Sequence, residues 1–100
     1  MADSSYDNFV LEELRDAELA AEYLSAAAQD GSIQEFLLAL RNVAEAHGGI
    51  GLLSETTNLN RQSMYKMLSD EGNPTLDSLL SVLKAVGLSL SFAPMEKEAA

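Results

Sequence analysis

The chain has 100 residues, of which 47% are apolar, and its formal net charge at pH 7 is −10. This length predicts one domain, and the absence of cysteine excludes disulfides and thiolate chemistry. No apolar run approaches the roughly 20 residues that span a bilayer, and the acidic N-terminus lacks the basic region of a signal peptide. We therefore expect a cytoplasmic protein with no membrane partner.

Residues 1–15 carry no clean hydrophobic period, because apolar side chains such as Phe9 and Leu14 stand among acidic ones. We expect a flexible acidic N-terminal arm that precedes a folded domain over residues 16–92. An apolar and acidic arm can dock into a basic groove of a partner, or it can pack back on its own domain. For Phe9 to Leu14 we favour packing on the domain.

Two helices are predicted next, each with its own N-terminal cap. Asp16 is a suitable N-cap for an alanine-rich helix, and Gly31 suits a left-handed position after its end. Ser32 and Glu35 form a capping box for a second helix that extends to about His47. The apolar residues of this second helix share one face at helical spacing: Ile33, Phe36, Leu37, Leu40, Val43 and Ala44.

The stretch from Gly49 to Ser69 predicts two short helices joined by a tight turn at residues 58–60. Asn60 can cap the second helix by accepting from the backbone N–H of Ser63 or its neighbour. Helical spacing places three residues of this helix inward: Met64, Met67 and Leu68. It leaves four outward: Arg61, Gln62, Tyr65 and Lys66. A short capped helix with this face suits DNA recognition, because its first turn can aim Arg at guanine and Gln at adenine.

The C-terminal third begins with a helix and then changes its period. Pro74 cannot continue a helix, and Thr75 can cap the next one, which ends before Gly87. Its apolar face is expected to hold Leu76, Leu79, Leu80, Leu83 and Val86. Residues 88–92 alternate with a period of two, which predicts a short β-strand. A lone strand is not stable, so we expect it to pair with a second copy in a two-fold homodimer, and residues 93–100 to form a disordered tail.

The charge is unevenly distributed along the chain. Residues 1–35 hold nine acidic residues against Arg15 alone, a net charge of −8, whereas residues 49–69 have a net charge of +1. The overall charge opposes DNA binding, since phosphate-binding surfaces need Lys and Arg. The asymmetry suggests two surfaces with different partners, although the acids can equally serve only to keep a small helical protein soluble.

The chain resembles the addiction-module antidote family, bacterial antitoxins of the HigA type with a Cro/repressor-like helix-turn-helix. The likeness covers about residues 16–92, and its most specific part is the run R-x-S-x-Y-K-x-L-S-x-x-G-N-P at residues 61–74. Further matching stretches are AAEYLSAA at residues 20–27 and FLLALRNVAEAHGG at residues 36–49. The resemblance implies an all-α, five-helix DNA-binding fold, to which the pattern adds the short C-terminal strand.

The resemblance also implies partners and site residues. The partners are operator double-stranded DNA, bound to repress the shared operon, and a small basic RelE/HigB-like toxin that cleaves messenger RNA. The base-reading side of the recognition helix matches Arg61, Gln62 and Lys66. Its phosphate-facing and capping side matches Asn60 and Ser63, to which we add the outward Tyr65. Gln62 departs from the Glu expected in many relatives, so the operator sequence should differ.

Other functions are weighed against this interpretation. A transcription regulator without a toxin partner uses the same fold, and the sequence barely separates the two. A protein-interaction module that does not bind DNA fits the net charge of −10. An enzyme is disfavoured: His47 is the only histidine, cysteine is absent, and no Gly-rich phosphate loop appears. For the same reason we expect no catalytic residues, no metal and no cofactor.

Overall fold

The computed structural model describes residues 11–96, which leaves the first ten residues of the predicted arm and the last four of the predicted tail outside the described range. Residues 11–14 are helical. The helices that follow are α2 (Ala17–Asp30), α3 (Ile33–Ala46), α4 (Gly49–Thr57), α5 (Arg61–Met67) and α6 (Leu76–Ala85). Within residues 11–96 there is no strand, so the prediction of an all-α fold is confirmed.

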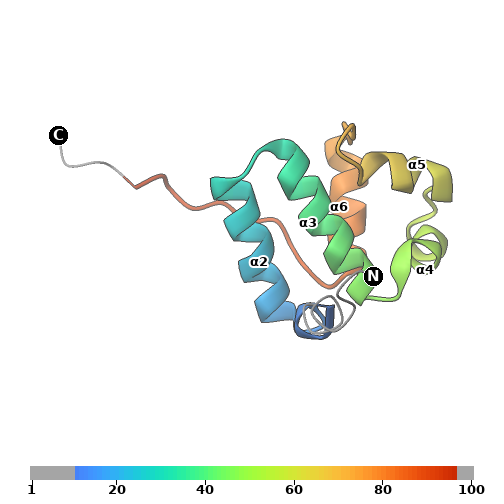
Figure 1. The fold of residues 1–100 in the computed structure, drawn as a ribbon, viewed down its shortest axis with the longest axis horizontal. Helices are drawn as coiled ribbons and strands as arrows, with labels where there is room; N and C mark the ends of the chain where they lie inside the picture. The colour runs from blue at the N-terminus through green and yellow to red at the C-terminus, as the bar shows by residue number, and fades with distance from the viewer. Residues whose placement is uncertain (1–10, 97–100) are drawn as a thin grey trace, which may run out of the picture.

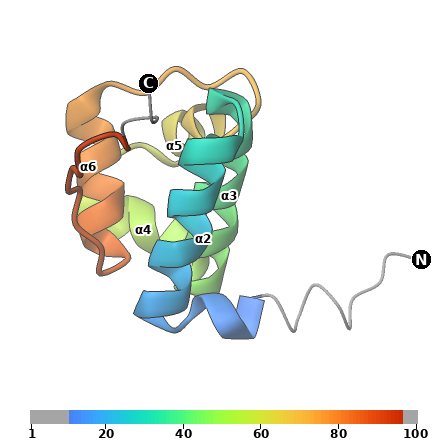
Figure 2. The same ribbon diagram turned by 90° about the vertical axis from the view of Figure 1, so that its left-hand side faces the viewer.

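Helix α3 lies at the centre of the arrangement (Figure 1). It packs against α2 on one side and against α4 on the other, and α4 in turn contacts α5 and α6. Asn42 of α3 also donates a hydrogen bond to the hydroxyl of Tyr23 on α2, at 2.8 Å. Figure 2 shows α2 running alongside α3 over most of its length. Helices α2 and α5 therefore lie at opposite ends of the helical array.

The predicted helix starts are confirmed by their hydrogen bonds. The side chain of each cap accepts from a backbone N–H in the first turn of the helix that follows; the caps are Asp16, Ser32, Asn60 and Thr75. At Ser32 the full capping box is present, since the Glu35 side chain also accepts from the Ser32 backbone N–H. Each cap satisfies N–H groups that a helix terminus otherwise leaves without a partner.

Glycines take two different conformations at the turns that follow α2 and α3. Gly48 and Gly49 adopt positive φ angles of 107° and 89°, which let the chain reverse between α3 and α4. The left-handed conformation expected for Gly31 is wrong, because its φ is −106° and its backbone is extended. A steric clash, and not the φ angle, disfavours larger residues at position 31, because a Cβ on Gly31 would lie 2.8 Å from the carbonyl oxygen of Ala27.

The core contains most of the predicted apolar residues, with exceptions at helix starts. Ile33 and Leu76, each the first residue of its helix, are 57% and 61% exposed. A side chain in the first turn projects beyond the neighbours that cover the rest of the face, which the spacing alone does not reveal. Leu80 is also exposed, and Val82, which the prediction left out, is buried in its place. The buried face of α6 thus lies about one residue from where the spacing put it.

Leu14 belongs to the core, with 3% of its surface exposed. This matches the preference for packing residues 9–14 on the domain as far as Leu14 is concerned; Phe9 lies outside the described residues. A side chain buried in this way cannot also contact a partner. Any contribution of the acidic segment to binding must therefore come from other residues.

The strand expected at residues 88–92 does not form within the described chain. The Leu88 N–H donates to the Leu83 carbonyl oxygen at 2.8 Å, which completes the end of α6. Beyond it residues 89–96 have no regular secondary structure, and Phe92 is 89% exposed. A strand needs hydrogen bonds from a neighbouring strand, and residues 11–96 supply no such neighbour.

We expect Leu40→Ala to lower the free energy of unfolding by about 2–5 kcal/mol, because it opens a cavity where α3 meets its neighbours. Leu38→Ala on the same helix is the matched control; this side chain is 43% exposed, so its loss should cost less than about 1 kcal/mol. Urea unfolding followed by circular dichroism measures both. Equal losses in the two variants would show that α3 does not form the centre of the core.

Candidate nucleic-acid interface

Helix α5 exposes a continuous polar face at one end of the molecule (Figure 1). The side chains of this face are exposed: Arg61, Gln62, Ser63, Tyr65 and Lys66. On the opposite side the predicted inward residues are buried: Met64, Met67 and Leu68. The orientation of α5 is therefore the predicted one, and contact between its outer face and DNA stays a prediction.

Asn60 holds the beginning of α5. Its Oδ1 accepts from the Gln62 N–H at 2.8 Å and from the Ser63 N–H at 3.2 Å. Ser63 thus takes part in the cap through its backbone, and its hydroxyl is not used there. Tyr65 has no part in the cap. Of the three residues assigned to phosphate contact and capping, Asn60 supplies the capping side chain.

The turn that aims α5 is fixed by hydrogen bonds within residues 53–59. Thr57 Oγ1 donates to the Leu53 carbonyl oxygen at 2.6 Å and accepts from the Leu59 N–H at 3.3 Å. Asn58 adopts a left-handed conformation with φ 61°, which asparagine tolerates better than most residues. The angle between α4 and α5 is consequently set by a closed local network.

The guanidinium group of Arg61 lies against the backbone of α4 at Gly51. A Cβ at this position would collide with the Arg61 Nη2 atom, so a glycine permits the approach. Sequence reasoning missed this contact, because Gly51 looked like an ordinary residue in a short helix. A glycine inside a predicted helix costs helix stability, and that cost was the available signal that Gly51 has another role.

Arg41, on α3, is a second residue that the sequence reasoning did not select. Its Cζ atom lies 5.6 Å from the centroid of the Tyr65 ring, within the range of a cation–π interaction. This contact joins the centre of the fold to the exposed side of α5. The only signal in the sequence was that Arg41 is the single basic residue among the apolar residues of α3.

One group of acidic side chains lies at the other end of the array. In the described part of residues 1–35 all seven acidic residues are exposed: Glu12, Glu13, Asp16, Glu18, Glu22, Asp30 and Glu35. They lie on α2, just before it, or at the start of α3, whereas α5 lies beyond α4 (Figure 1). The larger group of acids thus surrounds α2, while further exposed acids lie nearer to α5: Glu55 on α4, and Asp70 and Glu71 just after α5.

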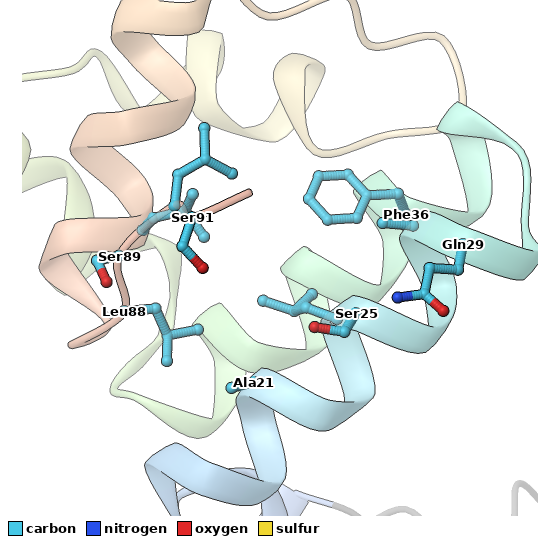
Figure 3. A pocket seen from close by; sticks show the side chains of 11 residues that line it. Ala21, Ser25, Gln29, Phe36, Leu88, Ser89 and Ser91 are labelled. Carbon is cyan, nitrogen blue, oxygen red and sulfur yellow. The ribbon is translucent and has the colours of Figure 1, made fainter. Parts of the chain in front are cut away.

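A groove of about 300 Å³ lies between α2 and the segment that follows α6. In Figure 3, Ala21 and Ser25 on α2 and Phe36 on α3 face Leu88 across this space. The lining is made of Leu, Ala, Phe, Ser and Gln side chains and carries no titratable group. Such a surface suits packing rather than chemistry, and it lies away from the exposed face of α5.

No chemical centre is evident in the described residues. Between residues 11 and 96, no three His, Cys, Asp or Glu side chains are grouped in a way that could hold a metal ion. His47 Nδ1 lies 2.9 Å from the Val43 carbonyl oxygen, so this ring hydrogen-bonds with the last turn of α3. Over the same range, none of the helices has the length and hydropathy needed to cross a membrane.

Fold and surfaces together define a small all-α protein that presents a capped polar helix at one end and an acidic surface at the other. Residues 4–94 match the model of a family described as probable addiction module antidote proteins, and the chain belongs to this family. A protein of Haemophilus influenzae, described as uncharacterized, is 32% identical over 88 residues, which cover 88% of this chain and 90% of that protein. No solved structure matches the chain significantly. The family description implies a toxin as partner.

Proposed function

We propose that this protein is the antitoxin of a type II toxin-antitoxin module. It binds operator DNA through α4 and α5, a helix-turn-helix of the Cro/repressor type, and so represses its own operon. It also neutralises a RelE/HigB-like toxin that cleaves messenger RNA. The observation that carries the proposal is the exposed, capped face of α5 in a chain of the antidote family.

The dimensions of α5 suit the major groove. Seven residues at 1.5 Å each give a helix of about 10 Å, and the groove, about 12 Å wide, admits an α-helix. Arg61 and Gln62 lie in the first turn, where recognition helices contact base edges. Lys66 lies one turn later, so it contacts the far part of the site. Asn60 keeps its amide NH₂ available for a phosphate, because the cap uses only its Oδ1 atom.

We expect Arg61→Ala and Lys66→Ala each to weaken binding to the upstream region of the gene by about 1–3 kcal/mol, the cost of a lost base contact. Lys84→Ala is the matched control: it removes one exposed positive charge from α6, outside the predicted contact. Gel-shift titration at fixed salt measures all three. Affinities of Arg61→Ala and Lys66→Ala that equal that of Lys84→Ala would refute the assignment.

A two-fold homodimer would let two copies of α5 reach half-sites about 34–36 Å apart. The segment after Leu88 supports such a dimer. Its residues 89–96 have no regular secondary structure and make no backbone hydrogen bonds within residues 11–96, and Phe92 is exposed. Pairing of residues 88–92 with the same segment of a second copy would supply the missing strand neighbour and cover the groove beside α2.

We expect Phe92→Ser to shift the protein toward monomer, because the side chain is exposed in one copy and covered in the dimer. Leu76→Ser, which changes a 61% exposed apolar residue on α6, should leave the association unchanged. Sedimentation velocity at micromolar concentrations separates the species. A wild-type protein that stays monomeric, alone and on DNA, would contradict the dimer.

The acidic surface is the proposed docking face for the toxin. A concentration of negative charge raises the association rate of a basic protein, while buried contacts supply most of the affinity. Because Leu14 is buried in the core, the acidic side chains around α2 carry the steering. The face of α5 then remains free for DNA while the toxin is bound.

We expect replacement of Glu12, Glu13, Glu18 and Glu22 by Gln to slow association with the protein encoded by the adjacent reading frame, and to reduce the salt dependence of that rate. The control replaces Asp77 on α6 by Asn, and Asp70 by Asn and Glu71 by Gln in the turn after α5. Stopped-flow binding at low and raised salt measures both sets. Equal rates in the two sets would show that the acids only solubilise the chain.

The alternative function is a stand-alone transcription regulator without a toxin partner. A regulator without a toxin would bind the upstream DNA but would have no small basic protein encoded beside it. Inspection of the neighbouring reading frame and a growth test with the two proteins co-expressed decide between the two functions.

A further inference from the structure

Helix α5 is too short to fix its own orientation. Two turns of helix are marginal in water, so tertiary contacts must hold it. Within the helix, the buried contacts come from Met64 and Met67, and methionine is a flexible side chain that adapts to the space around it. These contacts bury one side of α5, and a contact on its other side restricts the rotation of the helix about its own axis further.

Tyr65 supplies a contact on the exposed side of the same helix. Its ring is 44% exposed and lies under the guanidinium group of Arg41, with Cζ 5.6 Å from the ring centroid. Arg41 is half-buried on α3, the central helix of the fold. The pair therefore connects α3 with the exposed face of α5, at a point where rotation of α5 would separate ring and cation.

The neighbours of Tyr65 make this bridge relevant to recognition. Arg61 precedes Tyr65 by four residues, so the two side chains are adjacent on one face of the helix. Lys66 follows Tyr65 directly. Three of the five basic residues between positions 11 and 96 thus lie on or beside the outer face of α5: Arg41, Arg61 and Lys66.

We propose that Arg41 is a positioning residue for DNA binding: its guanidinium group holds the Tyr65 ring and thereby fixes the rotation of α5. This inference rests on the proposed DNA-binding function. Arg41 acts through the ring and makes no contact with the DNA itself. Arg61, Gln62 and Lys66 then meet the groove in one orientation instead of several, which reduces the ordering that binding would otherwise require.

A double-mutant cycle tests the pair. Arg41→Met keeps the aliphatic stem and removes the cation, and Tyr65→Leu removes the ring from a helix that leucine suits well. We expect each change to weaken affinity for the upstream DNA about two- to fivefold, the effect of one exposed cation–π contact. The double variant should be no weaker than either single one. Tyr65→Phe keeps the ring but removes the hydroxyl that could contact a phosphate, so its affinity is the reference from which the loss due to the ring is counted.

Salt dependence distinguishes positioning from direct contact. If Arg41 bound a phosphate, Arg41→Met would lower the slope of log affinity against log salt by about one. Positioning through Tyr65 leaves that slope equal to the wild-type value. A lowered slope, or effects that add in the double variant, would overturn the inference. Lys84→Met serves as the control for removing one positive charge elsewhere.

The cycle is also measured without DNA, as free energies of unfolding, which separates this inference from the proposed function. A wild-type protein that does not bind the upstream DNA refutes the function and this role together. Wild-type binding with an additive cycle refutes only the role of Arg41. Wild-type binding with strong coupling in affinity, and circular dichroism showing that all variants fold, supports both.

Discussion

A seven-residue helix such as α5 is not stable by itself, so packing against the neighbouring helices must stabilise it. Met64 and Met67 of α5, with Leu68 just beyond its end, are buried in the same core as the central helix α3. The closed turn at Thr57 and Asn58 sets the direction in which α5 leaves α4. Packing of the buried side of α5 and the Asn60 cap at its first turn together hold the helix, and so its polar face, in place.

The same arrangement separates two kinds of surface. Helix α2 carries acidic side chains and packs against one side of α3, while α4 and α5 lie on the other side. A partner attracted to the acids therefore meets α2 without covering α5. Under the proposed function, this separation would let one chain hold DNA and toxin together, since the two proposed contacts use different residues.

The sequence predicted the features that depend on near neighbours in the chain. The caps at Asp16, Ser32, Asn60 and Thr75 use residues within three positions of each other, so their signals are local. The inward orientation of the Met64 and Met67 side chains follows from helical spacing in the same way. The outward face of α5, the candidate site, was accessible to prediction for this reason.

The features that the sequence did not reveal depend on contacts between distant segments. The pairing of Arg41 with Tyr65 and the approach of Arg61 to Gly51 join different helices. The exposure of Ile33 and Leu76 depends on where the neighbouring helices end. At residues 88–92 the period of two was real, but a strand is a property of a pair, and within residues 11–96 there is no second segment to pair with.

The net charge of −10 is the strongest objection to DNA binding, and distance decides how much it matters. Helix α2 packs against α3, and α5 packs against α4 on the other side of α3 (Figure 1), while packed helices lie about 8–10 Å apart, so more than one helix diameter separates the two surfaces. At physiological salt the Debye length is about 8 Å, and exposed charges beyond it are largely screened. The charges near α5 therefore matter most for approaching DNA: residues 49–69 have a net charge of +1, and Asp70 and Glu71, which follow directly, bring residues 49–71 to −1. At low salt the screening length grows to about 30 Å, so the acids of α2 then repel the DNA as well. This repulsion increases as the salt concentration falls, and it opposes the usual increase in attraction between basic residues and phosphates.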